Sequence, residues 1–224
     1  MLVFFGLLPL AWDPAGAQSA DAPGWKTVRE DAGIVVSRWT APEQRLPRFR
    51  AVASIPATPL EVLAVIRDVD RHTEWRDRCR ESRVLARHAD GSILLYNRNE
   101  GSWPVSDRDV VLAVEPSFED DGRKIAVRFR SIESPLMPPR RGAVRMPSLV
   151  GHYRLELLGS GGTRVEYQID VDLGGHVPSF IARYVGEQMP LNTVSGLRAQ
   201  VARTGGQYDD WIREWLDTAP FEAE

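Results

Sequence analysis

The chain has 224 residues, a length that suits one domain of generous size, and its 43% hydrophobic and 26% charged residues are ordinary for a folded soluble protein. Its 28 basic and 31 acidic residues give a formal net charge of -3, which argues against a nucleic-acid-binding protein, because such proteins usually carry a basic face. The single cysteine, Cys79, excludes an internal disulfide and a cysteine-rich metal site.

The N-terminal segment differs in composition from the rest of the chain. Residues 2–11 are apolar, and Ala15-Gly16-Ala17 follows them as a small-x-small site, which is the order found in a secretory signal peptide. The apolar run is too short to span a membrane, and it lacks the preceding Lys or Arg that signal peptides normally have. We predict a signal peptide over residues 1–17, a single domain over residues 18–220 and a periplasmic or secreted protein. An apolar N-terminal tail on a cytoplasmic protein is the alternative.

Two strands and a helix are predicted next. Alternating apolar residues predict strands over residues 34–40 and 46–55. Thr58 is then a suitable N-cap residue, Pro59 suits the first helical position, and Glu61 places a negative charge in the first helical turn. A largely buried helix is therefore predicted, with Thr58 as its N-cap and Pro59 as its first helical residue.

A polar segment and a hairpin follow this helix. Residues 67–83 are mostly polar and are predicted as loops with a short helical turn around Trp75, which either fills the core or lines a pocket. Residues 84–88 and 93–99 have the pattern of strands. The Asp90-Gly91 pair between them is a strong signal for a β-hairpin.

Residues 103–111 combine an aromatic residue, a proline and alternating charges at the start of a hydrophobic strand. Pro104 lacks a backbone donor and therefore belongs at the beginning of a strand. Arg108 lies between Asp107 and Asp109 and can bind one of the two carboxylates through two hydrogen bonds. The stretch is therefore either a strand start held by an ion pair or a solvated cluster of surface charge.

The remaining strands alternate with turns and one long loop. Residues 110–115 continue as a strand, and residues 124–132 are predicted as a strand with one solvent-exposed face. Residues 149–158 and 163–173 are predicted as a hairpin around a glycine-rich turn. Residues 134–147 contain four prolines and are predicted as a long loop. Such loops in compact domains tend to be lids or the mouths of cavities.

The C-terminal part has a helical pattern. A helix is predicted from Pro178, kinked or restarted at Pro190, and a last amphipathic turn or two is predicted around Trp211. Antiparallel strands followed by one long helix predict an α+β fold in which a curved sheet grips the helix. This arrangement usually leaves an interior space, because a large curved sheet is hard to fill with side chains.

Several of these segments resemble the START domain, the lipid-transfer module related to steroidogenic acute regulatory protein. The resemblance covers about residues 25–203, and its motifs are weak singly but occur in the order and spacing of the family. They are residues 33–38 of the first strand, the helix over residues 58–68 with Trp75 after it, residues 104–111, strand residues 151–155 and 163–167, residues 172–175 and 177–178 before the last helix, and residues 197–198 within it.

The resemblance implies a helix-grip fold with a hydrophobic tunnel that holds one lipid beneath a lid formed by the C-terminal helix. Some sterol-binding relatives have an internal arginine six residues after the motif arginine. Here that position is Val114, which favours a fatty acyl lipid or a phospholipid over a sterol. Arg108 and Asp109 are assigned to the structural motif. The residues expected to line the tunnel, each with ordinary core packing as the alternative, are Trp75, Ile93, Leu95, Tyr96, Val127, Phe129, Tyr167, Ile169, Phe180, Tyr184, Met189, Leu191 and Val194.

The sequence offers little support for catalysis. The four histidines lack the spacing of metal ligands, and no G-x-S-x-G elbow occurs. We therefore expect no metal, no cofactor and no catalytic residue. A polyketide-cyclase-like or hydrolase-like enzyme that uses the same cavity is one alternative, and a non-catalytic ligand sensor is another.

The expected partner is a lipid or another hydrophobic small molecule, carried or presented by a monomer, and no nucleic acid. Transient contact with a membrane is expected at the tunnel mouth, where Arg140 and Arg141 stand beside Leu136 and Met137.

Overall fold

The computed structural model describes residues 24–40, 48–101, 103, 105–175 and 177–218. The predicted signal peptide and Pro104 lie outside this part of the chain. The strands form one sheet in the order β1-β2-β3-β10-β9-β7-β6-β5-β4, in which neighbours run antiparallel, and β8 pairs with β6 in parallel. The strands are β1 (Trp25–Asp31), β2 (Ile34–Trp39), β3 (Arg48–Ile55), β4 (Cys79–Arg87), β5 (Ile93–Asn99), β6 (Asp107–Glu119), β7 (Lys124–Ser131), β8 (Ala143–Arg145), β9 (Ser148–Leu157) and β10 (Thr163–Asp172).

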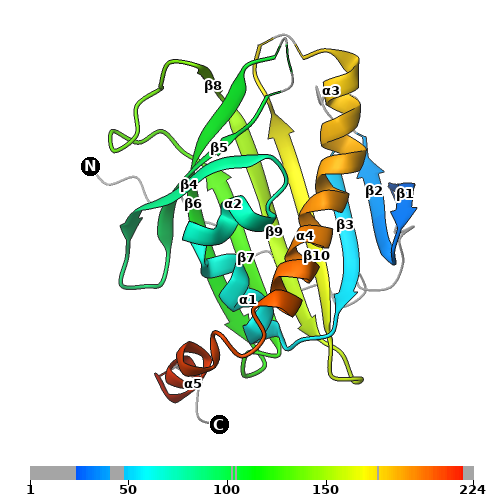
Figure 1. Ribbon diagram of the computed structural model, residues 1–224, viewed down its shortest axis with the longest axis vertical. Helices are drawn as coiled ribbons and strands as arrows, with labels where there is room; N and C mark the ends of the chain where they lie inside the picture. The colour runs from blue at the N-terminus through cyan, green and yellow to red at the C-terminus, as the bar shows by residue number, and fades with distance from the viewer. Residues whose placement is uncertain (1–23, 41–47, 102, 104, 176, 219–224) are drawn as a thin grey trace.

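The sheet curves around the C-terminal helix α4, and α1 and α2 lie on the same side of the sheet (Figure 1). The predicted α+β fold is therefore confirmed. Among the residues described, none of the helices combines the length and the apolar character that crossing a bilayer requires. The helical segments are α1 (Pro59–Arg67), η2 (Val69–Arg71), α2 (His72–Trp75), α3 (Ser179–Arg183), the π-helical turn η3 (Tyr184–Gln188), α4 (Met189–Arg203) and α5 (Asp209–Thr218).

Alternation along the strands selects the residues that face α4. Ile125 and Val127 of β7 and Val165 and Ile169 of β10 are buried, as the apolar pattern predicts. Leu197 of α4 is fully buried in the same core. The core therefore lies between the concave face of the sheet and α4.

Helix α1 begins where the sequence predicts, because its first turn satisfies its own backbone donors. The Thr58 hydroxyl accepts a hydrogen bond from the Glu61 amide at 3.3 Å, and the Glu61 carboxylate accepts one from the Thr58 amide at 2.6 Å. This reciprocal pair is a capping box. It orients the helix that walls one side of the cavity described below.

Strands β1, β4 and β8 differ most from the prediction, and β6 extends beyond the predicted residues 110–115 at both ends. Strand β1 was not predicted; among the described strands it lies at the sheet edge, and it pairs with β2 in an irregular register. Strand β4 begins at Cys79 and not at residue 84, because two irregularities in its pairing with β5 interrupt the alternation that marks a strand. Strand β8 lies within the predicted loop of residues 134–147, and its three residues depend on pairing with β6.

The last long helix is interrupted before Pro190. Because proline has no amide hydrogen, Pro190 cannot donate to the turn before it, and the chain forms the π-helical turn η3 at this place. Gly186 of that turn packs against the ring of Phe49, where an added Cβ would collide. The interruption therefore brings the helix backbone close to β3.

Candidate functional site

The first of two cavities lies between the sheet and helices α1 and α2. It occupies about 710 Å³ when the solvent-filled space at its open mouth is counted. Arg67 and Arg87 contribute exposed cationic side chains to its boundary. Its wall is mainly apolar and is formed by Leu63, Ile66, Val69, Trp75, Ile93, Leu95, Leu112, Val114, Pro116, Val127, Phe129 and Tyr153.

The second cavity lies between β9, β10 and the segment from α3 to the start of α4. It occupies about 860 Å³ including its mouth. Its polar residues include Asp77, Arg78, Glu100 and Arg108, so charged side chains of both signs are more numerous in its wall than in the wall of the first cavity. Its apolar wall is formed by Val105, Met146, Leu149, Tyr167, Ile169, Val171, Leu173, Ile181, Tyr184, Val185 and Met189.

Arg76 lines both cavities. It follows α2 directly, and α2 packs closely on α4 because Gly196 leaves room for the Trp75 carbonyl. In the amide orientation that satisfies Asn97, the Asn97 Oδ1 accepts a hydrogen bond from Arg76 Nη1 at 2.7 Å. Burial opposes the charge of Arg76, but the oxygens of Tyr153 and Tyr167 raise its pKa. Among the described residues, no carboxylate forms an ion pair with this guanidinium.

Two stacked tyrosines stand beside Arg76. Tyr153 lines the first cavity and Tyr167 lines the second, and the centroids of their rings lie 4.7 Å apart. The Tyr153 hydroxyl and the Trp75 indole nitrogen are buried and have no hydrogen-bond partner in the described part of the chain. Burial raises the pKa of Tyr153, so its hydroxyl stays a neutral donor. The two cavities thus adjoin at a junction of aromatic rings and one cation.

The predicted lining residues separate into three groups. Trp75, Ile93, Leu95, Val127 and Phe129 line the first cavity. Tyr167, Ile169, Tyr184 and Met189 line the second. The other four predicted residues line neither cavity: Leu191 and Val194 are buried in the core, Phe180 is 54% exposed, and Tyr96 lies in a separate cluster with Val111 and Met137.

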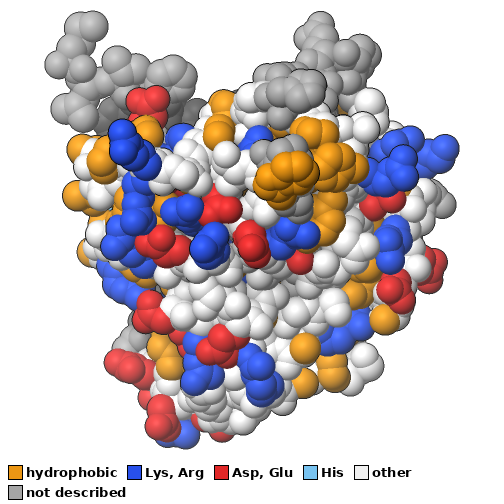
Figure 2. Space-filling model, turned by 45° about the horizontal axis from the view of Figure 1, so that its top comes forward, with side chains coloured by type: hydrophobic (Ala, Val, Ile, Leu, Met, Phe, Trp, Pro, Cys, Tyr) orange, Lys and Arg blue, Asp and Glu red, His pale blue; other side chains and the backbone are white. Residues whose placement is uncertain are grey.

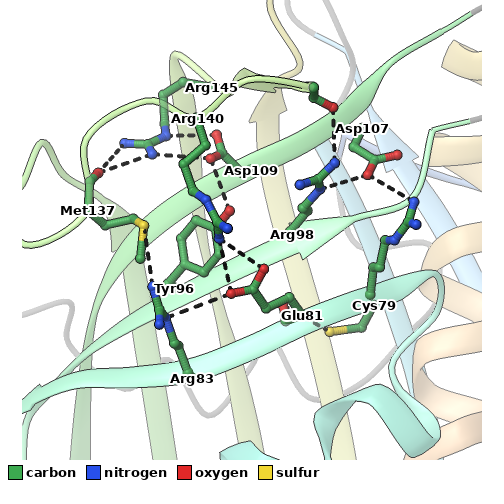
Figure 3. Close-up of polar contacts among 12 residues, drawn as sticks. Cys79, Glu81, Arg83, Tyr96, Arg98, Asp107, Asp109, Met137, Arg140 and Arg145 are labelled. Atoms are coloured by element: carbon green, nitrogen blue, oxygen red, sulfur yellow. Dashed lines mark hydrogen bonds and ion pairs between the residues drawn. The ribbon is translucent and has the colours of Figure 1, made fainter.

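Tyr96 belongs to a polar network on the other face of the sheet from Leu95, drawn in Figure 3. Its hydroxyl donates to Asp109 Oδ2 at 3.2 Å. Arg145 binds the same carboxylate through Nε at 2.8 Å and Nη2 at 3.2 Å. Met137, expected near a bilayer, is instead buried beside this network, and its backbone oxygen accepts from Arg145. The network ties β5 and β6 to the segment that contains β8.

The ion pair considered within residues 103–111 does not form, and the stretch is not a solvated surface cluster either. Neighbouring strand residues point to opposite faces, so Arg108 faces away from Asp107 and Asp109. Arg108 donates instead to the carbonyl oxygens of Ser106 at 2.7 Å, Leu173 at 3.4 Å and Gly174 at 3.4 Å. It therefore ties the start of β6 to the end of β10.

His72 lies at the boundary of the first cavity and is buried in its neutral form. Its Nε2 donates to the Ile66 carbonyl at 2.8 Å, and its Nδ1 accepts from the Ser82 hydroxyl at 3.1 Å. Burial, together with the nearby charge of Arg76, lowers the pKa of His72 to about 3.

This lowered pKa predicts loss of stability in acid. The pKa of His72 is near 6.5 in the unfolded chain and near 3 in the folded protein. Between these two pH values the unfolded chain binds one more proton than the folded protein does. As the pH falls through this range, His72 therefore lowers the free energy of unfolding by about 1.4 kcal/mol per pH unit. Urea unfolding at pH 7.5 and pH 5 should show a His72 contribution of about 2 kcal/mol, absent from His72→Gln. The exposed His88→Gln is the control, and an equal pH dependence in His72→Gln and the wild type would contradict the assignment.

Comparison with known proteins then identifies the family. Residues 17–205 match the START domain. The chain belongs to the START domain family. An uncharacterized protein of Pseudomonas aeruginosa is 31% identical over 183 residues, which are 82% of this chain and 89% of that protein. The phosphatidylcholine transfer protein of Rattus norvegicus is 25% identical over 166 residues, 73% of this chain and 77% of its own length.

A solved structure agrees with this assignment. The STAR-related lipid transfer protein from Xanthomonas axonopodis superposes with a TM-score of 0.72 at 29% identity, over 80% of this chain and 99% of that one. START proteins bind and transfer lipids, and START domains are typically not enzymes. Helix α5 lies beyond the matched residues, and its Trp211 ring lies 4.4 Å from the guanidinium of Arg67 at the first cavity.

Several lining residues were not predicted from the sequence, and the two that matter most at the junction are Arg76 and Tyr153. Arg76 lies in a segment whose polar composition predicts a solvated loop. Tyr153 lies in a strand of the predicted hairpin, but alternation does not show whether a side chain on the apolar face packs in the core or lines a cavity. The one available signal was Trp75, an aromatic residue within the polar segment. Among the described residues, no three His, Cys, Asp or Glu side chains gather in a way that can hold a metal ion.

Proposed function

We propose that this START domain binds one lipid, a fatty acyl lipid or a phospholipid rather than a sterol, and carries it as a monomer. The observation that supports this is the pair of adjoining, mainly apolar cavities beneath the sheet and α4. Each methylene group that enters such a space gains about 0.8 kcal/mol, so an acyl chain alone supplies substantial affinity. The phosphatidylcholine transfer protein among the relatives agrees with a lipid of this class.

Val114 supports the exclusion of sterols. It is the residue at which the resemblance to sterol-binding relatives would require an arginine, and here it adds an apolar side chain to the first cavity. A sterol hydroxyl at this wall would be left without a hydrogen-bond partner, which costs about 1–3 kcal/mol for a buried polar group. An acyl chain has no polar group to satisfy there.

We further propose that the chain meets a membrane at the mouth of the second cavity. Figure 2 shows hydrophobic side chains gathered at the end of the molecule at which α3 lies. Trp103 is 93% exposed and Phe180 is 54% exposed, and each stands within two residues of side chains that line the second cavity. Leu136, 56% exposed, and the basic pair Arg140 and Arg141 suit a second contact with lipid head groups.

Native mass spectrometry of the purified protein tests the carrier function. We expect a monomer that retains one lipid of defined mass and, after delipidation, moves a fluorescent phospholipid or fatty acid between vesicles. Trp103→Ala should slow this transfer several-fold without changing the affinity for the lipid, because the indole contacts only the membrane. Arg213→Ala, an exposed change on α5, serves as the control. A protein that neither retains a lipid nor binds any of a lipid panel would rule out the proposal.

We also propose that the protein acts in the periplasm or outside the cell. The apolar run of residues 2–11 and the small-residue site that ends at Ala17 support export. Fractionation of expressing cells tests this proposal, since export predicts that the mature protein starts near Gln18.

A further inference from the structure

Arg76 is a half-buried cation that lines both cavities, and its protein partners among the described residues are neutral. Its guanidinium contacts Asn97, the Tyr167 hydroxyl and, at 3.5 Å, His72 Nδ1. The neighbouring carboxylate of Asp77 is occupied elsewhere, because it accepts hydrogen bonds from Tyr184 and from Asn192 Nδ2. A cation that faces mainly apolar cavities without a counter-charge is unfavourable, and proteins normally pair such a charge.

Two further hydrogen-bond donors beside Arg76 lack acceptors among the described residues. The Tyr153 hydroxyl and the Trp75 indole N–H belong to side chains that are 5% and 7% exposed, and neither has a hydrogen-bond partner. Both residues line the first cavity together with Arg76. A buried donor without an acceptor costs about 1–3 kcal/mol, and this cost is removed when a bound molecule supplies the acceptor.

The geometry points to an acidic head group, a carboxylate or a phosphate, bound at the junction by Arg76 with support from Tyr153 and Trp75. This inference rests on the proposed lipid-carrying function and specifies which lipids the cavity selects. An arginine fork can bind two oxygens of either group, whereas an alcohol offers a single uncharged oxygen. On this inference the acyl chain extends along the apolar wall of the first cavity, and a second chain extends along the apolar wall of the adjoining one.

Matched lipid pairs test the inference. Delipidated protein is titrated with oleic acid, oleyl alcohol, dioleoyl phosphatidic acid and dioleoylglycerol, and bound lipid is counted by native mass spectrometry. We expect the wild type to bind at least one acidic lipid about 10- to 100-fold more tightly than its neutral counterpart, as a charge-assisted hydrogen bond predicts. Preference for oleic acid alone would identify a carboxylate ligand, and preference for phosphatidic acid alone a phosphate ligand.

Variants assign the preference to Arg76. Arg76→Met should abolish it, and Arg76→Lys should retain part of it because the charge remains. Arg80→Met removes an exposed arginine from the same part of the chain and should leave the preference intact. Tyr153→Phe should weaken binding of the acidic lipid without lowering the melting temperature of the ligand-free protein, since the lost hydroxyl has no partner there.

The outcomes separate this inference from the proposed function. Equal affinity for acidic and neutral lipids, or a preference that survives Arg76→Met in a protein with wild-type melting temperature, would overturn the head-group site while leaving the lipid carrier intact. If Arg76→Met does not fold, Tyr153→Phe decides: unchanged affinity for acidic lipids overturns the site. Binding of none of the four lipids would overturn the head-group site, and the carrier would be overturned as well only if the protein also retained no lipid and bound none of a wider lipid panel.

Discussion

Replacing Asp109 with alanine is expected to lower the free energy of unfolding by about 3–5 kcal/mol, the usual cost of breaking a buried ion pair from one side. Asp109 is fully buried and accepts two hydrogen bonds from Arg145 and one from Tyr96. Its removal leaves the guanidinium of Arg145 without a counter-charge and the buried Tyr96 hydroxyl without an acceptor. Urea unfolding of the two proteins measures the difference.

Two further variants test this explanation for Asp109. Tyr96→Phe removes one hydrogen bond but leaves the ion pair, so it should cost only about 1 kcal/mol. Asp210→Ala removes the carboxylate of an exposed pair with Arg213 and should change stability by less than about 1 kcal/mol. If Asp109→Ala unfolded at the same urea concentration as Asp210→Ala, the network would not hold β6 and β8 together.

Replacing Val114 with tryptophan is expected to reduce lipid binding at least 10-fold while the protein remains folded. Val114 is half-buried on β6 and lines the first cavity, so the larger side chain can occupy the space that an acyl chain would fill. Displacement of about two or more methylene groups at about 0.8 kcal/mol each accounts for a change of this size. Native mass spectrometry and urea unfolding report binding and stability separately.

The control for Val114→Trp is the next residue of the same strand. The side chain of Ala113 points to the opposite face of the sheet, so Ala113→Trp should add the same bulk outside the cavity and leave lipid binding unchanged. Wild-type affinity in Val114→Trp would show that the first cavity does not hold the ligand. Equal loss in both variants would indicate distortion of β6 and not occlusion.

Predictions from local patterns succeeded where one face of an element decides its position. The alternation in β7 and β10 correctly predicted their buried faces, and Thr58 and Glu61 correctly predicted the start of α1. The same reasoning failed for β4, whose register irregularities hide the alternation, and for the three residues of β8, which form a strand only by pairing with β6. A strand that depends on a distant partner has no period of its own to detect.

The partners of the ion pairs could not be predicted from local patterns either. The acid, base and acid at residues 107–109 suggested a local pair, yet Asp109 binds Arg145 and Asp107 binds Arg98 at 2.7 Å. Strand alternation separates neighbours in sequence, and sheet pairing brings distant residues together. The resemblance to the START domain assigned Arg108 and Asp109 to a structural motif, and the structure supplies the distant partners of both residues.

The sequence by itself determined the α+β fold, the family and the apolar character of the interior, because periodicity, capping residues and motif order are local properties of the chain. Only the tertiary structure decided what stands at the centre of the interior. Arg76 looks like one more charge in a polar segment, and it becomes a cavity-lining cation because the close packing of α2 on α4 at Gly196 carries it between the two cavities. Burial depends on packing between distant segments, which no local pattern in the sequence records.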